Sequence, residues 1–382
     1  MSISLQQIAE LVGGQVNASP NLRITGAASI ARAAAGQLTF VTSPQHWQQF
    51  LASPAAAAIV SGIDVSGIDV SGIDVSGIDV SAGDVLESEP TKTKPCIVVQ
   101  DAEAAFAKVV AFFCPPVRRP RVGVSPAAQI APSAVIEADV DIYPGAFVGE
   151  GTVISRGSRI YPGVCILENC RIGRDVTIFP NAVLYENTVV GDGSIVHAGV
   201  VLGAHGFGYR TRNGRHELSP QLGHVRLGSQ VEIGANSTVD RGTFEATTIG
   251  DGSKLDDQVM IGHNCQIGRH NLLCSQVGIA GSSSTGDYVV MAGQVGIGDH
   301  IQIGEKTTLC AKAGIMNDVP AGQVYLGIPA TPIREQMQIM ACVNKLPELR
   351  SQVRSLGKQL AAVQTAAGTD MIEPDRAENK AA

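Results

Sequence analysis

Charged and aromatic residues are scarce in this chain of 382 residues. Only 16% of the residues are charged and 4% are aromatic, the net charge is -7, and no basic stripe interleaved with aromatic residues occurs. Nucleic-acid-binding domains usually carry such a basic surface, so the composition argues against nucleic acid as a partner. The sequence also lacks a long apolar run and a basic leader followed by an apolar segment, so we expect neither export nor stable membrane insertion.

Cysteine pairs with the spacing of metal sites or disulfide frameworks are also missing. None of the eight cysteines forms a CxxC pair, whereas structural zinc sites and small disulfide-rich domains use regular cysteine spacings. We therefore expect reduced thiols rather than disulfides or a zinc site held by cysteines, and a cytoplasmic location. As separate expectations, the protein uses no metal and no cofactor.

Glycine is abundant, with 43 residues, and accompanies a repeat of six. Every sixth residue is aliphatic over Val124–Leu202, over Leu227–Val239 and over Ile249–Ile315, with Thr285 as the one exception. Small residues stand two positions earlier. Three hexads close one triangular coil and place one branched side chain per face in its core. The pattern predicts a mainly β fold, a left-handed parallel β-helix of nine to ten coils over 122–328.

Both ends of the chain lack this period. Residues 1–115 predict a small α/β domain. Within it, four copies of "SGIDV" at 61–80 are interpreted as an insertion in a surface loop. With a period of five, the apolar residues would point to opposite faces of a strand in successive copies, so the repeats cannot form a strand with one apolar face. Residues 330–366 show a heptad spacing of apolar residues and predict C-terminal helices, separated at Pro347, that need a partner. The polar segment 367–382 is expected to be disordered.

Two histidines have a spacing that places both near one edge of the solenoid. His263 lies two residues after the core position Ile261, and His300 follows 37 residues later, about two coils plus one residue. An imidazole can act as a general base at neutral pH, and Asp256, one hexad earlier, is a candidate for the carboxylate that sets its tautomer. The alternatives are a solvated edge histidine and a zinc site shared at subunit contacts.

Segments along almost the whole chain resemble the UDP-3-O-acylglucosamine N-acyltransferases of lipid A biosynthesis. They are "ITGAASI" and "LTFVTSP" near the N-terminus, "GAHGFGY", "VEIGANSTVDRGT" and "IGHNCQIG" in the solenoid, and "YLGIPA" after it. The resemblance implies a homotrimer with active sites in clefts between adjacent solenoids. It also implies that acyl carrier protein delivers a 3-hydroxyacyl thioester, which the 2-amino group of UDP-3-O-acyl-glucosamine attacks.

The same resemblance assigns roles to the residues around "IGHN". His263 matches the catalytic base, and His300 matches a second active-site histidine. Gly281 falls where the family uses a backbone N–H as oxyanion donor. Asn264, next to the base, is counted among the substrate-binding residues.

The remaining substrate-binding positions are carried over from more distant segments. Phe40 matches an aromatic residue that stacks on uracil, while Ser43 and His46 stand where the family has an asparagine and a second stacking tyrosine. Gly314 and Met316 match residues that line the groove of the acyl chain. Competing interpretations are another hexapeptide O- or N-acyltransferase acting on a UDP-sugar and a zinc-binding, carbonic-anhydrase-like solenoid.

Overall fold

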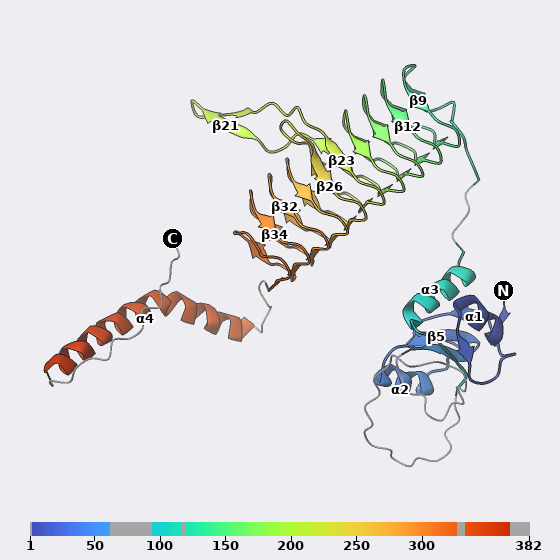
Figure 1. The fold of residues 1–382 in the computed structure, drawn as a ribbon, viewed down its shortest axis with the longest axis horizontal. Helices are drawn as coiled ribbons and strands as arrows, with labels where there is room; N and C mark the ends of the chain where they lie inside the picture. Colours follow the sequence, from blue (N-terminus) through green and yellow to red (C-terminus); the bar gives the residue numbers. More distant parts are fainter. Residues whose placement is uncertain (1, 62–93, 116–119, 327–332, 367–382) are drawn as a thin grey trace, which may run out of the picture. The chain divides into compact units, whose positions relative to one another are not determined.

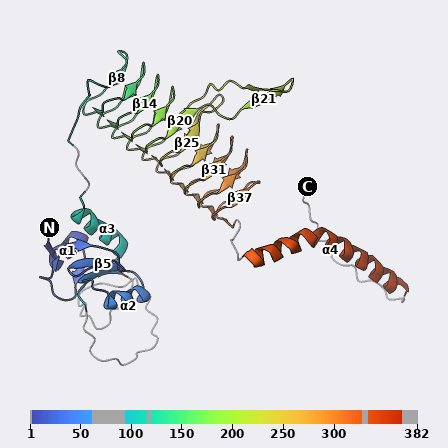
Figure 2. The same cartoon turned by 180° about the vertical axis from the view of Figure 1, so that it is seen from behind.

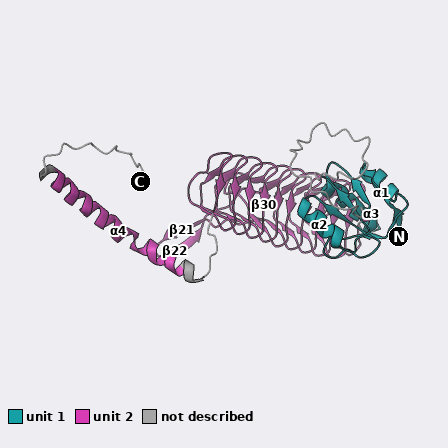
Figure 3. Cartoon of the chain, turned by 90° about the horizontal axis from the view of Figure 1, so that it is seen from below, with its two compact units in different colours: residues 1–120 teal, residues 121–382 magenta. Residues whose placement is uncertain are grey.

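The computed structural model of the chain describes residues 2–61, 94–115, 120–326 and 333–366. These residues form two units, 1–120 and 121–382, which are coloured separately in Figure 3. The predicted pentapeptide insertion, apart from its first residue, and the C-terminal tail lie outside the described residues. No helix in the described part of the chain is long and apolar enough to cross a membrane.

The first unit is a small α/β domain. Its five-stranded sheet has the order β2 (Gln15–Val16), β7 (Cys96–Val98), β6 (Ala57–Val60), β5 (Gln37–Val41) and β4 (Gly26–Ala27). A separate antiparallel pair consists of β1 (Ile3–Ser4) and β3 (Arg23–Ile24). The helices are α1 (Leu5–Val12), α2 (Pro44–Ala52) and α3 (Ala102–Phe113).

The two faces of this sheet pack against different helices. Leu38 and Ile59 lie in one core cluster with residues of α1 and α3. Val41 and Val60 lie in a second cluster with Phe50 of α2. Because side chains of a strand alternate between faces, α1 and α3 cover one face of the sheet and α2 covers the other. The predicted α/β domain is therefore confirmed as part of the fold class.

The second unit is dominated by a left-handed parallel β-helix, as the period of six predicts (Figure 1). Its strands form three long sheets in which each strand pairs in parallel with the strand one coil away. Sheet one contains β10 (Asp141–Ile142), β13 (Arg159–Ile160), β16 (Thr177–Ile178), β19 (Ile195–Val196), β24 (Glu232–Ile233), β27 (Lys254–Leu255), β30 (Leu272–Leu273), β33 (Val290–Met291), β36 (Thr308–Leu309) and β38 (Val324–Tyr325). Sheet two contains β8 (Gln129–Ile130), β11 (Phe147–Val148), β14 (Cys165–Ile166), β17 (Val183–Leu184), β20 (Val201–Ala204), β25 (Thr238–Asp240), β28 (Met260–Ile261), β31 (Gly278–Ile279), β34 (Gly296–Ile297) and β37 (Gly314–Ile315). Sheet three contains β9 (Val135–Ile136), β12 (Val153–Ile154), β15 (Arg171–Ile172), β18 (Val189–Val190), β23 (Val225–Leu227), β26 (Thr247–Ile249), β29 (Gln266–Ile267), β32 (Ser284–Thr285) and β35 (Gln302–Ile303).

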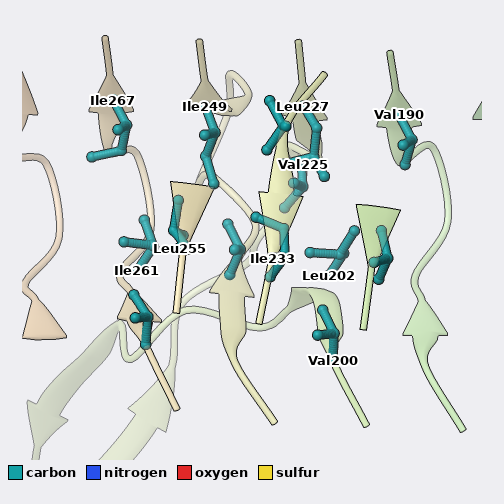
Figure 4. Close-up of a cluster of buried hydrophobic side chains, with 14 of the residues drawn as sticks. Val190, Val200, Leu202, Val225, Leu227, Ile233, Ile249, Leu255, Ile261 and Ile267 are labelled. Carbon is teal, nitrogen blue, oxygen red and sulfur yellow. The ribbon is translucent and has the colours of Figure 1, made fainter. Parts of the chain in front are cut away.

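Apart from β32, which contains Thr285, and the exposed last strand β38, the strands contribute inward aliphatic side chains to a continuous column. Figure 4 shows part of this column, and Val190, Leu202 and Ile261 in it are at most 1% exposed. Burying such a side chain contributes about 1.5–3 kcal/mol. The sheets of 10, 10 and 9 strands confirm the predicted nine to ten coils.

The small residues before the core positions connect successive coils. Ser158 Oγ donates to the carbonyl oxygen of Gly173 at 2.8 Å and accepts the N–H of Val176 at 3.1 Å. The same pair of bonds, each to backbone groups of the next coil, is made by Ser194, Ser253 and Ser283. A hydroxyl at this position thus satisfies backbone groups at the turn that would otherwise be buried without partners.

Thr285, which interrupts the aliphatic pattern, has a polar partner inside the coil. The fully buried Asn271 donates from Nδ2 to Thr285 Oγ1 at 2.6 Å and accepts the N–H of Val289 at 2.6 Å. Thr285 Oγ1 also accepts the N–H of Gly268 at 3.0 Å. The two side chains satisfy each other, so the column tolerates a polar residue here.

Asp141 caps the first coil, and its charge should stabilise that end of the solenoid. The side chain is 3% exposed and accepts hydrogen bonds from the N–H groups of Val122 and Gly123 and from Arg121. Burial raises the pKa of Asp141, but these hydrogen bonds together lower it below its ordinary value. The stabilisation is therefore present above about pH 4 and is lost as the pH falls through the lowered pKa.

We expect Asp141→Asn to lower the free energy of opening of this coil by about 1–3 kcal/mol at pH 7. The measurement is hydrogen exchange of segment 120–126, corrected for the intrinsic rate at each pH. Asp139→Asn is the matched control, because Asp139 also pairs with Arg121 but is 71% exposed. Equal protection of the Asp141 variant and the parent chain at pH 7 would contradict the assignment.

The C-terminal segment is one helix, α4 (Ile333–Ala366), and the prediction of two helices separated at Pro347 is wrong. Proline removes one N–H and crowds the carbonyl one turn earlier, which can bend a helix without ending it when strong helix formers flank it. Figures 1 and 2 draw α4 as one continuous ribbon, and Pro347 lies inside it. The predicted heptad residues are all more than half exposed: Leu346, Leu349, Val353, Leu356, Leu360 and Val363.

Candidate active site

One corner of the solenoid, where each strand of sheet two ends, carries both predicted histidines. The strands β28, β31 and β34 pair in register, so Ile261, Ile279 and Ile297 stack on successive levels. The main chain continues this stacking beyond the strands. Ser282 N donates to the carbonyl oxygen of His263 at 2.8 Å, and His300 N donates to that of Gly281 at 3.1 Å. We call this line of residues the sheet-two corner.

Two loops leave the solenoid at the same corner. Residues 205–224 follow β20 and contain the exposed hairpin of β21 (Tyr209–Arg212) and β22 (Arg215–Leu218), which projects away from the coils (Figure 1). Residues 241–246 follow β25. Their excursions interrupt the period of six and bring additional side chains to the corner.

Arg241 anchors both loops. Its side chain is 5% exposed, donates from Nε to the carbonyl oxygen of Gly203 at 2.9 Å, and pairs with Glu186 at 2.7 Å. Its backbone N–H bonds to the carbonyl oxygen of Ala204 at 2.9 Å. Burial raises the pKa of Glu186, but the hydrogen bond and charge of Arg241 lower it to below the ordinary value. The starts of the two loops are thus fixed to each other.

The His263 side chain lies between two glycines. A Cβ added to Gly206, in the first loop, would lie 2.5 Å from His263 Cβ. A Cβ added to Gly281, one level along the corner, would lie 2.6 Å from His263 Cε1 and 2.7 Å from Nε2. Separations this short do not occur between packed atoms, so only glycine leaves room for the ring on either side.

The imidazole bonds to the residue that follows it. His263 Nδ1 lies 2.9 Å from Asn264 Oδ1. The same oxygen accepts hydrogen bonds from Thr243 N at 3.2 Å and from Thr243 Oγ1 at 3.0 Å. Asn264 is thereby bound to the second loop, and its amide oxygen makes hydrogen bonds within the protein.

Asp256 does not fill the role expected of it within one chain. Its carboxylate accepts the N–H groups of Asp257 at 2.8 Å and Ser275 at 3.0 Å, and no bond to His263 occurs among the described residues. Asp256 and His263 are seven residues apart, one hexad plus one residue, and strand β28 of sheet two lies between them. Asp256 follows β27 of sheet one and therefore lies at a different corner from His263.

The acidic side chain near His263 is Asp240, which the sequence reasoning missed. It ends β25, one level before His263, and is 5% exposed. Burial raises the pKa of Asp240 to about 6, and the charge of His263 opposes this rise. In the described part of the chain its carboxyl group has no hydrogen-bond partner. The sequence feature that could have identified Asp240 is its position directly after the core residue Val239, which pairs with Ile261 at the corner that carries His263.

Gly281 and His300 extend the corner by one and two levels. The N–H of Gly281 donates no hydrogen bond within the described residues, whereas its carbonyl oxygen is bonded to His300 N. The His300 side chain is 74% exposed and lies 3.2 Å from Asp299 Oδ2. The structure therefore places both histidines at one corner, as their spacing predicted, with Gly281 between their levels.

Gly314 and Met316 lie further along the same sheet and corner. Gly314 pairs with Gly296, which pairs with Gly278, and a Cβ added to any of the three would meet no atom within 4 Å. The outer face of sheet two is therefore flat here. Met316 is 84% exposed.

The expected nucleotide-binding residues lie in the first unit. Phe40 of β5 packs against Phe106 of α3, with ring centroids 4.9 Å apart, and is half-buried. Ser43 is the N-cap of α2 and its Oγ accepts the N–H of His46 at 3.2 Å. His46 is exposed in the first turn of that helix. Ser43 thus already has a structural role.

No group of three or more His, Cys, Asp or Glu side chains in the described ranges is arranged to hold a metal ion.

Comparisons with known proteins cover both units. The family model described as bacterial transferase hexapeptide (six repeats) matches residues 169–204 and 246–281. A UDP-3-O-acylglucosamine N-acyltransferase of Rhodopirellula baltica is 46% identical over 95% of each chain, and one of Methylacidiphilum infernorum is 46% identical over 94% of this chain and 95% of its own. A solved UDP-N-acetylglucosamine O-acyltransferase of Moraxella catarrhalis is 24% identical, with a TM-score of 0.42 over 57% of this chain and 78% of that one. The two N-acyltransferases match nearly the full length of this chain.

Proposed function

This chain belongs to the family of UDP-3-O-acylglucosamine N-acyltransferases and is an acyltransferase of lipid A biosynthesis, and from that premise we propose how it works. It transfers a 3-hydroxyacyl chain from acyl carrier protein to the 2-amino group of a UDP-3-O-acyl-glucosamine, with His263 as general base. No metal and no cofactor takes part. The observation that carries the proposal is the His263 ring fixed between Gly206 and Gly281, beside the Gly281 N–H, which bonds to no acceptor among the described residues.

The reaction requires a base and an oxyanion donor next to each other. The amine nitrogen attacks the thioester carbonyl carbon, and His263 accepts the proton that the nitrogen loses. Negative charge builds on the carbonyl oxygen, and the Gly281 N–H donates a hydrogen bond to it. When the C–S bond breaks, the proton on His263 passes to the departing thiolate. Asp240 is a source of negative charge that favours the intermediate imidazolium.

His300 and the outer face of sheet two complete the substrate site in this proposal. His300 assists binding or the transition state from two levels further along the corner. The flat strip through Gly314, with Met316 beside it, accommodates the acyl chain, because side chains that would obstruct it are missing there. In the first unit, Phe40 stacks on uracil, and Ser43 and His46 contact the nucleotide.

Assembly and location follow from the same premise. We propose a cytoplasmic homotrimer with its sites between adjacent solenoids, and exposed apolar residues along α4 support a role for this helix in assembly. The same helix carries basic residues suited to steer the acidic acyl carrier protein: Lys345, Arg350, Arg354 and Lys358.

The proposal is tested with purified acyl carrier proteins that carry 3-hydroxyacyl chains of graded length. The acceptors are UDP-3-O-acylglucosamine and, as the matched alternative, UDP-N-acetylglucosamine, which offers a hydroxyl but no free amine. We expect an amide product with the first acceptor and none with the second, detected by mass spectrometry. Acylation of the hydroxyl acceptor instead would favour the O-acyltransferase alternative, and inactivity with every chain length would refute the donor.

A further inference from the structure

We propose that Thr243 is a positioning residue which, through Asn264, fixes His263 in the tautomer that carries its proton on Nδ1 and its lone pair on Nε2. This inference rests on the proposed function, in which His263 is the base. It adds a residue of the second loop to the machinery. The three side chains form one hydrogen-bonded chain.

The orientation of the Asn264 amide follows from its neighbours. The backbone N–H of Thr243 can only donate, and its target is the terminal amide atom of Asn264 that lies 3.2 Å away. That atom must therefore be the oxygen and not the NH₂ group, which removes the usual ambiguity of an asparagine side chain. The hydroxyl of Thr243, 3.0 Å from the same atom, adds a second donor.

The tautomer of His263 then follows from the same oxygen. Oδ1 of Asn264 carries no hydrogen, so the Nδ1 atom 2.9 Å away must be the donor. A neutral imidazole has one N–H, so Nε2 holds the lone pair. A Cβ on Gly281 would lie 2.7 Å from Nε2 and 3.0 Å from Nδ1, so the ring lies against Gly281 with Nε2 as the nearer nitrogen.

The loop that carries Thr243 is held by bonds independent of the imidazole. Leu222 N donates to the Thr243 carbonyl oxygen at 2.7 Å, and Gly223 N donates to that of Gly242 at 3.0 Å. Arg241 fixes the start of the same loop through Glu186. The donors on Thr243 are thus placed by the packing of both loops, which explains why the excursions occur at this corner.

An amide partner has a different effect from a carboxylate. It selects the tautomer by hydrogen-bond direction and adds no full charge to the ring. The negative charge is supplied separately by Asp240, which is nearly buried and bonds to no donor in the described chain. Orientation and charge stabilisation are thereby divided between two residues.

The test combines the ¹⁵N spectrum of the imidazoles with steady-state kinetics on the full-length protein. His263 is assigned by the signals lost in His263→Gln. In the parent chain we expect Nδ1 to show the shift of a protonated nitrogen and Nε2 that of an unprotonated one. Asn264→Gly removes the oxygen and suits the backbone, because Asn264 has a φ of 62°. This variant should show a mixture of tautomers and a kcat lower by about 10–100-fold, with KM little changed.

Three further variants sharpen the result. Asn264→Asp keeps an acceptor and should keep the tautomer. Thr243→Val removes one donor, so the amide is less well fixed and part of the His263 population should change tautomer. Thr248→Val is its matched control, because Thr248 bonds to Gln266 outside the site, at 2.6 Å. A parent spectrum with the proton on Nε2, or an unchanged tautomer in Asn264→Gly, would overturn the proposal. The spectrum does not depend on turnover, so a failure of the proposed reaction is recognised separately.

Discussion

Replacing His263 with alanine should lower kcat by roughly 10²-fold or more while the solenoid stays folded. The substitution removes the base that accepts the amine proton. Stability should change little, because the ring lies at the sheet-two corner and not in the axial column, where Ile261 is fully buried. The measurements are kcat with carrier-protein thioester and UDP-sugar amine, and thermal unfolding followed by circular dichroism.

Two other histidines provide graded comparisons. His300→Ala should reduce kcat less severely than His263→Ala, because in this chain the side chain contacts Asp299 and is largely exposed. His270→Ala should leave activity near normal, since that ring stacks on Tyr288, with centroids 5.1 Å apart, at another corner. Near-normal turnover of the His263 variant would remove the base from the mechanism.

The period of six determines how much of this site could be predicted from the sequence. One inward residue per face fixes both the level and the corner of every neighbouring position. His263 lies two residues after Ile261 and Gly281 two residues after Ile279, so counting alone stacks them. The same count places His300 two levels further along.

The contacts that the two loops make with His263 could not be predicted by counting residues in steps of six. Thr243 and Gly206 lie where the period is interrupted, and their approach to His263 depends on how the two loops fold back on each other. Asp240 was missed because the loop 241–246 interrupts the period between it and His263, so counting by six did not show that they lie on adjacent levels of one corner. The expected bond between Asp256 and His263 is not formed within the described chain, because a step of one hexad also moves a residue to the next corner of the triangle.

Gly281→Ala should lower kcat by about 10²-fold without a comparable loss of stability, because a catalytic group displaced by about 1 Å can lose that much. The new methyl carbon would lie 2.6 Å from His263 Cε1, so the ring must move. Gly293→Ala is the matched control. It lies two residues after the core position Met291 of sheet one, as Gly281 lies two residues after Ile279 of sheet two, and its added Cβ would meet only the carbonyl oxygen of Ser275, at an ordinary contact distance of 3.6 Å. Equal kinetics of the two alanine variants would contradict the steric argument.

The double variant His263→Ala/Gly281→Ala separates displacement of the ring from loss of the oxyanion donor. If the methyl group acts only by moving the imidazole, it should cost nothing further once the imidazole is gone, and the two effects should be strongly non-additive. If it also disturbs the Gly281 N–H, the double variant should fall below His263→Ala alone, because that donor acts on the carbonyl oxygen independently of the base. The residual rate of the double variant therefore measures how far the backbone of Gly281 contributes to catalysis apart from making room for His263.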